Sequence, residues 1–239
     1  MVVALESSVN DSSWRFVEMD ETAKCRRGDS SFASVIVGWW SKHGRDFPWR
    51  QTSDPFRILV AEILLQRSRS GTVASVYSQL FQRWSTPREL AVSDMAELEH
   101  LISPLGLKSR ATSIKAAAIG WSERKKPPDT AEELQELNGV GAYSANATAI
   151  AMSWNADPCV DSVSIRVLRR YLDDKNDGLT DIQVASRAYS LVSKDQWREL
   201  NWAILDLAAA VCMPRRPRCP NCPLEDRCKW ARKQGQKRI

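Results

Sequence analysis

Apolar residues recur at intervals of three and four positions along most of this chain from residue 31 onward. The clearest stripe consists of Val73, Val76, Tyr77, Leu80, Phe81 and Trp84. This is the period of an α-helix with one buried face, and no segment alternates with the two-residue period of a strand. The sequence therefore predicts an all-α fold. Helices are expected near residues 32–43, 56–67, 73–84, 109–121, 142–153, 162–171, 181–193 and 195–211, with shorter ones starting at 86, 93 and 130.

The predicted helix over residues 56–67 is apolar on almost every side except at Glu62. A helix of that composition is buried, and a buried carboxylate has either a cationic partner or a pKa raised by loss of water. Glu62 is therefore either half of a structural ion pair with an arginine or an acid able to transfer a proton. Three polar residues end this helix, and they either enter a nucleic-acid groove or form a solvated helix end: Gln66, Arg67 and Ser68.

Between two predicted helices the chain reads Leu-Asn-Gly-Val-Gly over residues 137–141. Glycine adopts left-handed backbone angles at little cost, and it leaves its N–H group unshielded. A glycine turn entering a helix can therefore present N–H donors to an anion, assisted by the helix dipole. The turn is either such an anion site or a plain helix–helix connection. Asp161 stands later, before another predicted helix, where an aspartate suits the N-cap position.

Four cysteines close to the C-terminus have the spacing C-x6-C-x2-C-x5-C, and they are Cys212, Cys219, Cys222 and Cys228. Four thiolates on one compact loop can hold a tetrahedral zinc ion or an iron–sulfur cluster. Zinc sites usually combine two closely spaced cysteine pairs, and only the middle pair here has that spacing. The pattern favours a [4Fe–4S] cluster over zinc, and a loop without metal is the remaining alternative.

Positive charge is concentrated in the same region. The whole chain has 239 residues and a formal net charge of +5, yet residues 212–239 alone hold nine Lys and Arg against two acidic residues, or +7, which leaves −2 for the remainder. This favours a polyanionic partner. Between the first two cysteines lie Arg215, Arg216 and Arg218, which either clamp phosphates or only add solubility.

The rest of the composition is that of an ordinary globular protein, with 43% hydrophobic and 26% charged residues. No apolar run approaches the ~18 residues that span a membrane, and the N-terminus lacks the pattern of a signal peptide. We therefore expect a cytoplasmic protein associated with the nucleoid and no membrane partner. Residues 1–30 show no sustained period and are expected to be a flexible leader, and residues 233–239 are expected to be a basic tail.

These motifs together resemble one family, the helix–hairpin–helix DNA glycosylases with an iron–sulfur cluster, which includes endonuclease III, MutY and the mismatch thymine/uracil glycosylases. The resemblance covers about residues 31–230 and rests on the Leu-x-Gly-Val-Gly-x-Tyr-x-Ala turn, the Val-Asp that follows and the four cysteines. It implies two lobes. One is a six-helix barrel over residues 54–159, with the helix–hairpin–helix at about 130–153. The other joins residues 31–53 to 160–232 and carries the cluster loop, 212–228.

The resemblance also implies roles for individual residues. Asp161 falls at the family's catalytic aspartate, whose carboxylate would stabilise positive charge on the sugar as the N-glycosidic bond breaks. Tyr143 would line the pocket that receives a flipped base, and Glu62 would act on that base as an acid. Double-stranded DNA with a mismatched or damaged base is the expected partner of a monomer. Residues expected on DNA, besides the arginines and the polar helix end, are Leu137, Gly139, Val140 and Gly141.

Within the family, three features favour the thymine/uracil branch. Tyr143 stands where members with lyase activity carry a lysine, so no Schiff base can form there and a monofunctional glycosylase is expected. The chain ends eleven residues after Cys228, without the reader of 8-oxoguanine that MutY has. The segments 66–68 and 105–107 match the thymine glycosylases more closely than MutY. The expected substrate is thymine or uracil opposite guanine.

Three alternatives remain open at this point. They are an adenine glycosylase lacking its reader domain, a glycosylase for a modified pyrimidine, and a non-catalytic DNA-binding cluster protein. Two departures from the family pattern bear on the choice. Val163 replaces a polar Asn of MutY, and Asn138 replaces the usual proline of the hairpin. Either departure indicates a branch with an altered substrate.

Overall fold

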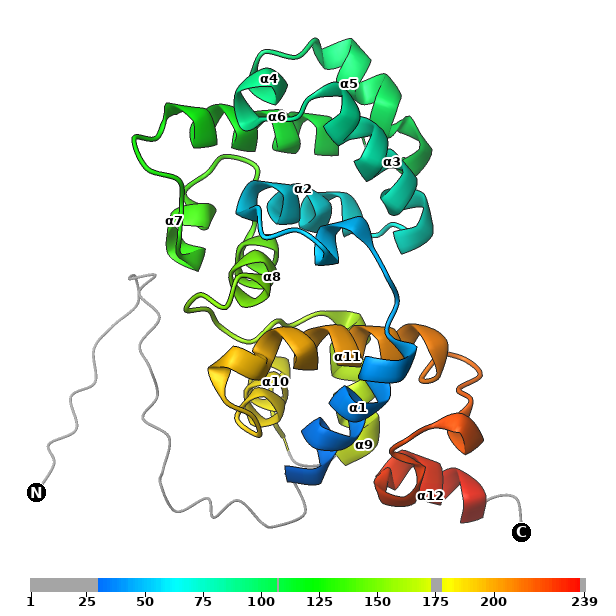
Figure 1. The fold of residues 1–239 in the computed structure, drawn as a ribbon. Coiled ribbons are helices and arrows are strands. Elements are labelled where there is room, and N and C mark those ends of the chain that lie inside the picture. Colours follow the sequence, from blue (N-terminus) through cyan, green and yellow to red (C-terminus); the bar gives the residue numbers. More distant parts are fainter. Residues whose placement is uncertain (1–29, 107, 173–177, 237–239) are drawn as a thin grey trace, which may run out of the picture.

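The computed structural model describes residues 30–106, 108–172 and 178–236, and every regular element within these ranges is a helix (Figure 1). The all-α expectation is confirmed. The expected leader lies outside the described part except for Ser30, which begins the first helix. Residues 237–239 of the expected basic tail lie outside it as well.

The barrel lobe, the upper part of Figure 1, surrounds one hydrophobic core. Helix α2 is central to it, because α3, α6 and α8 all pack against it and most of its side chains are buried. Among the described residues, this lobe consists of η1 (Pro48–Arg50), α2 (Pro55–Leu65), α3 (Ser70–Arg83), α4 (Pro87–Ala91), α5 (Met95–Ile102), η2 (Ser103–Leu105), α6 (Ser109–Glu123), α7 (Ala131–Gln135) and α8 (Ala142–Ala151).

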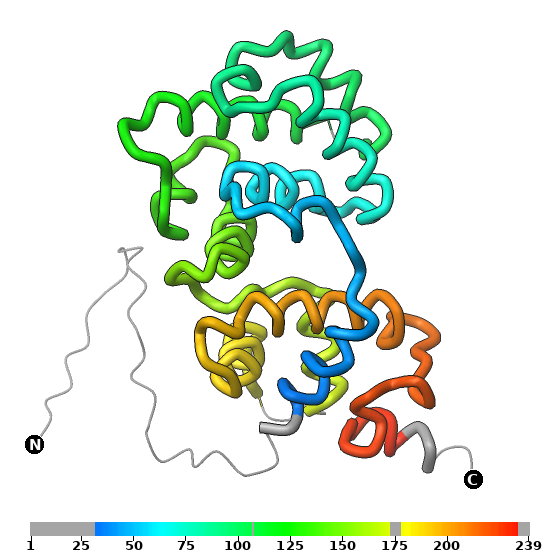
Figure 2. The backbone as a smooth tube through the Cα atoms, in the orientation of Figure 1, coloured from blue at the N-terminus to red at the C-terminus, as the bar shows by residue number. Residues whose placement is uncertain are grey.

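The terminal lobe joins the two ends of the described chain around a second core, as the blue and red segments of Figure 2 show. Helix α1 packs along α11, and α9 contacts α10, α11 and α12. Its described elements are α1 (Ser30–His43), α9 (Ser162–Leu172), α10 (Asp181–Tyr189), η3 (Lys194–Gln196), α11 (Trp197–Ala210), η4 (Cys219–Asn221), η5 (Glu225–Arg227) and α12 (Lys229–Gln236).

Helix α8 belongs to both lobes. Its Ala145 is part of the barrel core, whereas Ala147, Ala149 and Ile150 are part of the terminal core, and the helix also contacts α11. A helix of small residues permits this close approach on two sides. The chain crosses between the lobes on either side of it, first ahead of α2 and again between α8 and α9 (Figure 1). Residues on α8 and in these crossings are therefore placed at the lobe junction.

Three helices end at least two residues earlier than their apolar pattern predicts: α10 ends at Tyr189 instead of residue 193, and the other two end at a left-handed residue. Helix α2 stops at Leu65 and is followed by Arg67 at φ 56°, and α8 stops at Ala151 and is followed by Ser153 at φ 58°. A single left-handed residue redirects the chain and closes the last turn. The pattern of apolar residues does not predict such a helix end, because the end depends on backbone angles and not on side-chain polarity.

Candidate functional site

Glu62 lies on α2, surrounded by the buried side chains of the barrel core, and retains part of its own surface. Among the described residues, none forms a hydrogen bond or ion pair with it, and the nearby Arg50 is paired with Asp206 instead. Burial raises the pKa of Glu62 to about 7; Arg50 opposes that rise and Asp161 adds to it. Among the described residues, the alternative of a structural ion pair is therefore not found, which leaves the alternative of an acid with a raised pKa.

Asp161 caps the N-terminus of α9. One carboxylate oxygen, Oδ1, accepts the N–H groups of Val163 at 2.7 Å and Ser164 at 3.0 Å, and Oδ2 accepts the Ser164 hydroxyl. These bonds fix the carboxylate where it is close enough to Glu62 to influence its charge. The N-cap reading of Asp161 is thus correct, and capping leaves the carboxylate half-buried at the lobe junction.

Tyr143 stands on the first turn of α8, packed against the terminal core. Burial raises the pKa of its phenol well above the usual value, and the charges of Glu62, Cys159 and Asp161 raise it further. The three residues that the sequence singled out for catalysis therefore lie close enough for Glu62 and Asp161 to influence each other and Tyr143 electrostatically. Glu62 comes from the barrel lobe, Asp161 from the terminal lobe, and Tyr143 from the helix that the lobes share.

The polar segment after α2 is held by a buried arginine that the sequence analysis missed. Arg110 on α6 donates to the Ser68 hydroxyl at 2.8 Å, to the Leu105 carbonyl at 3.1 Å and to the Gln66 carbonyl. The side chains of Gln66 and Arg67 remain exposed, and Gln66 Nε2 donates to the Ser144 hydroxyl on α8 at 3.0 Å. Arg110 precedes Ile114 by one helical turn on the buried face of α6, and this spacing could have predicted that the arginine is buried.

The glycine turn joins α7 to α8 and packs on α6. Gly139 has φ +85°, and a Cβ there would lie 2.6 Å from the Ser113 Cα. Leu137 and Val140 are buried in the barrel core, so only their main-chain atoms remain as candidates to contact DNA. Gly141 is exposed, and no side chain caps the helix that begins after it. The turn therefore presents uncapped amides of α8 to the surroundings.

We predict that Gly139→Ala lowers the free energy of unfolding by about 3 kcal/mol, because it forces both a left-handed alanine and a clash with the α6 backbone. Gly141→Ala is the matched control. Its φ is −89° and nothing lies within 4 Å of the added Cβ, so stability stays nearly unchanged. Chemical denaturation of both variants measures the difference, and equal losses would contradict the packing argument.

The four cysteines line a single small cavity between α9, the end of α11 and α12. Among the described residues, no three His, Cys, Asp or Glu side chains are grouped closely enough to hold a single metal ion. Arg170 donates to Cys212 Sγ at 3.4 Å, and main-chain N–H groups donate to Cys222 and Cys228. Burial nevertheless raises the pKa of Cys222 to about 11. The bare thiol of Cys222 would therefore stay protonated at neutral pH.

The three arginines of the cysteine loop are all exposed: Arg215, Arg216 and Arg218. The loop itself is anchored, since the Arg218 N–H donates to the Val211 carbonyl at 2.9 Å and Arg170 donates to the Met213 carbonyl at 2.7 Å. A fixed loop with exposed guanidinium groups can bind phosphates without first being ordered.

In the described ranges, every helix is too short or too polar to span a bilayer.

An all-helical, two-lobed protein with paired carboxylates at the lobe junction and an open hairpin beside them has the architecture of a DNA base-excision enzyme. Residues 60–192 match the HhH-GPD superfamily of base excision DNA repair proteins, and the chain belongs to that family. The expected fold and the expected class of enzyme, a DNA glycosylase, are both confirmed.

Individual relatives agree with this. A thymine-DNA glycosylase of Aeropyrum pernix is 36% identical over 81% of this chain and 91% of its own length. The human adenine DNA glycosylase is 31% identical over 88% of this chain and 41% of its own length. A solved structure of a thermostable thymine-DNA glycosylase superposes with a TM-score of 0.77 at 29% identity, over 86% of this chain and 97% of that one.

Proposed function

We propose that this chain is a monofunctional DNA glycosylase, active as a monomer, that releases thymine or uracil paired with guanine. The observation that carries the proposal is the meeting of a fixed carboxylate, Asp161, and a proton-holding acid, Glu62, beside Tyr143. The similarity to a thymine-DNA glycosylase over 91% of that protein's length supports the substrate.

The chemistry follows from these positions. The target nucleotide leaves the base stack and its base enters beside Tyr143, which offers a ring face and a hydroxyl. As the bond between the base nitrogen and C1′ of the sugar breaks, Asp161 stabilises the positive charge that builds on the sugar. Glu62 gives its proton to the departing base. Water adds to C1′, and its proton returns to the carboxylates, which leaves an abasic site and the free base.

Strand cleavage is not part of this proposal. A lyase step needs an amine that forms a Schiff base with the sugar aldehyde, and the phenol of Tyr143 cannot form one. The abasic product therefore remains until alkali cuts it.

Binding of the duplex is proposed at three exposed surfaces. The amides at Gly141 and the start of α8 would bind phosphate, aided by the helix dipole. Gln66 and Arg67 lie next to that helix, since Gln66 reaches Ser144 on its first turn, and they would occupy the space left by the flipped nucleotide. The exposed arginines of the cysteine loop would contact phosphates further along the duplex.

We propose that the cysteine cavity binds a [4Fe–4S] cluster through Cys212, Cys219, Cys222 and Cys228. The donor set fits, because four sulfurs surround one space and several N–H groups point at them. The bound cluster would hold the arginine loop in shape. Iron analysis of the purified chain tests this, and zinc in place of iron would contradict it.

The substrate is tested by single-turnover base release from duplexes that carry T·G, U·G, A·G, A·8-oxoguanine and normal pairs. We expect release from T·G and U·G, with strand cleavage only after alkali. Release of adenine alone would instead favour the adenine glycosylase, which the similarity to the human enzyme keeps as the second candidate. Strand cleavage without alkali would contradict the monofunctional assignment, and tight binding without any release would contradict the proposed substrate.

A further inference from the structure

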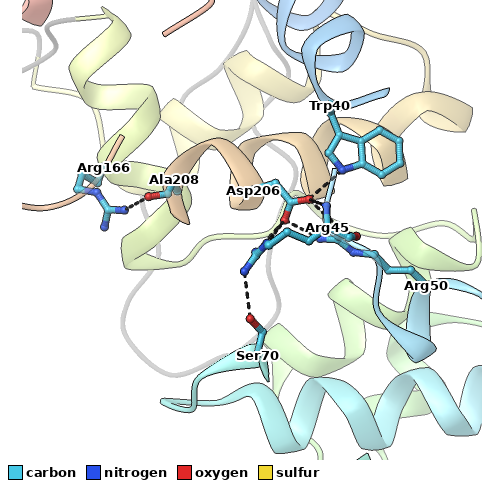
Figure 3. A network of polar contacts seen from close by, with 7 residues as sticks. All are labelled: Trp40, Arg45, Arg50, Ser70, Arg166, Asp206 and Ala208. Atoms are coloured by element: carbon cyan, nitrogen blue, oxygen red, sulfur yellow. Dashed lines mark hydrogen bonds and ion pairs between the residues drawn. The ribbon is translucent and has the colours of Figure 1, made fainter. Parts of the chain in front are cut away.

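The most connected polar group in the described part of the chain is Asp206, a fully buried carboxylate on α11 (Figure 3). It accepts hydrogen bonds from the Trp40 indole at 3.0 Å and from the Arg45 main-chain N–H at 2.8 Å. It also pairs with two guanidinium groups, those of Arg45 and Arg50. All three donor residues precede α2, so Asp206 ties the terminal lobe to the segment that leads into the barrel.

The two arginines are held in different ways. Arg45 is partly exposed. Its guanidinium also donates to the Ser70 hydroxyl at 3.0 Å, at the start of α3, and its guanidinium carbon lies 5.0 Å from the Phe47 ring centre. Arg50 is 8% exposed and bidentate, with Nη1 and Nη2 at 2.8 and 3.1 Å from the two oxygens of Asp206. Its guanidinium carbon lies 5.3 Å from the Phe47 ring centre and 5.0 Å from that of Trp202. Rings and carboxylate together leave Arg50 a single position.

From that position the charge of Arg50 acts on Glu62 without pairing with it. The other charge that influences Glu62 is that of Asp161, and Glu62 in turn raises the pKa of Tyr143 on α8 and of Cys159 in the crossing after α8. In the described part of the chain, neither α3 nor α6 contributes a charge to Glu62, although both pack against α2. Arg50 is thus the one cation of the described residues that acts on Glu62, and both of its terminal nitrogens donate to Asp206.

We propose that Asp206 is a positioning residue for the glycosylase reaction, because it holds Arg50 away from Glu62 and thereby keeps Glu62 unpaired and protonated. Without Asp206, the freed guanidinium of Arg50 would turn to Glu62 and hold it as an ion, because η1 packs against α2 and Glu62 has no partner among the described residues. The inference rests on the proposed role of Glu62 as the acid. The contacts of Asp206 with Arg45 and Arg50 would thus join the two lobes and also control the protonation of Glu62 in the barrel.

Two substitutions should move the pH profile in opposite directions. In Asp206→Asn the charge of Arg50 is no longer compensated, so it stabilises the ionised form of Glu62 and lowers the pKa of that carboxyl. The midpoint of the alkaline limb of the pH profile therefore falls by about one pH unit. In Arg50→Met the opposing charge is absent and the midpoint rises by a similar amount. Methionine also keeps an apolar chain between Phe47 and Trp202. A loss of rigidity alone would not produce shifts of opposite sign.

The experiment is the single-turnover rate of uracil release from a U·G duplex between pH 5.5 and 9 for the full chain and each variant. Arg45→Met is the matched control, since it removes the other guanidinium from Asp206, and its midpoint should stay in place. If Asp206→Asn does not fold, as judged by circular dichroism, Arg50→Met decides, and an unmoved midpoint there overturns the inference. Shifts of both variants in the same direction also overturn it.

Glu62→Gln separates this inference from the proposed function. If the alkaline limb persists in Glu62→Gln, the proposed role of Glu62 fails and the inference fails with it. If the limb disappears in Glu62→Gln but stays in place in Asp206→Asn and Arg50→Met, only the inference fails.

Discussion

Replacing Asp161 by Asn is expected to reduce single-turnover base release by about 1,000-fold while DNA affinity is kept or increased. The amide oxygen of asparagine can still accept the N–H groups of Val163 and Ser164, so the cap of α9 survives. What disappears is the negative charge that would stabilise the sugar cation. Removing a carboxylate from a surface that faces phosphates should not weaken binding.

The control for that experiment is Asp94→Asn, which makes the same change at another helix cap. Asp94 caps α5 by accepting the Glu97 N–H at 2.9 Å, and it lies on the barrel surface. This variant should release base at the wild-type rate. Base release by Asp161→Asn within about tenfold of wild type would show that Asp161 is only a structural cap. A DNA-binding protein without catalysis would lose nothing measurable in either variant.

Replacing Glu62 by Gln is expected to lower the single-turnover rate about 100-fold or more, because the departing base loses its proton donor. The pH dependence should change with it. Since the pKa of Glu62 is about 7, wild-type activity should fall as the pH rises through 7, and Glu62→Gln should lack that fall. Glu97→Gln, at an exposed position paired with Arg83, is the control and should leave the profile unaltered.

Glu62→Gln should also stabilise the protein at alkaline pH. A carboxyl whose pKa rises from 4.5 unfolded to about 7 folded binds more protons in the folded state, so stability declines as the pH rises from about 4.5 to 7 and stays lower above that. The penalty reaches at most about 3 kcal/mol at pH 8. Glu62→Gln should therefore unfold at higher denaturant concentration than wild type at pH 8 but not at pH 4.5. If Glu62→Gln and wild type are equally stable at both pH values, the pKa of Glu62 is not raised in the folded protein.

Local structure could be predicted from the sequence because it depends on neighbours in the chain. Apolar periodicity predicts the helices, and Asp54 before Pro55 predicts the start of α2, where the aspartate accepts the Phe56 N–H at 2.9 Å. Gly139 marks the turn at which a left-handed residue is needed. The spacing of four cysteines is likewise a local property, and the structure places all four around one cavity.

Only the tertiary structure decided which charges meet. The sequence left Glu62 either paired or free, and both readings fitted its buried helix. The outcome depended on Asp206, on a distant helix, which takes both terminal nitrogens of Arg50 and leaves Glu62 without a partner. Leu137 and Val140 similarly stand in the motif expected on DNA, yet their side chains fill the barrel core.

By itself, the sequence of this protein determined its helices, its caps, its glycine turn and the spacing of its four cysteines. The physical reason is that backbone angles, helix faces and cysteine spacing are set within a few residues. The junction of Glu62, Asp161 and Tyr143, the buried anchor Arg110 and the Asp206 network were decided by the packing of two lobes on α8. Burial and charge pairing depend on distances through space, and these exist only once the lobes have come together.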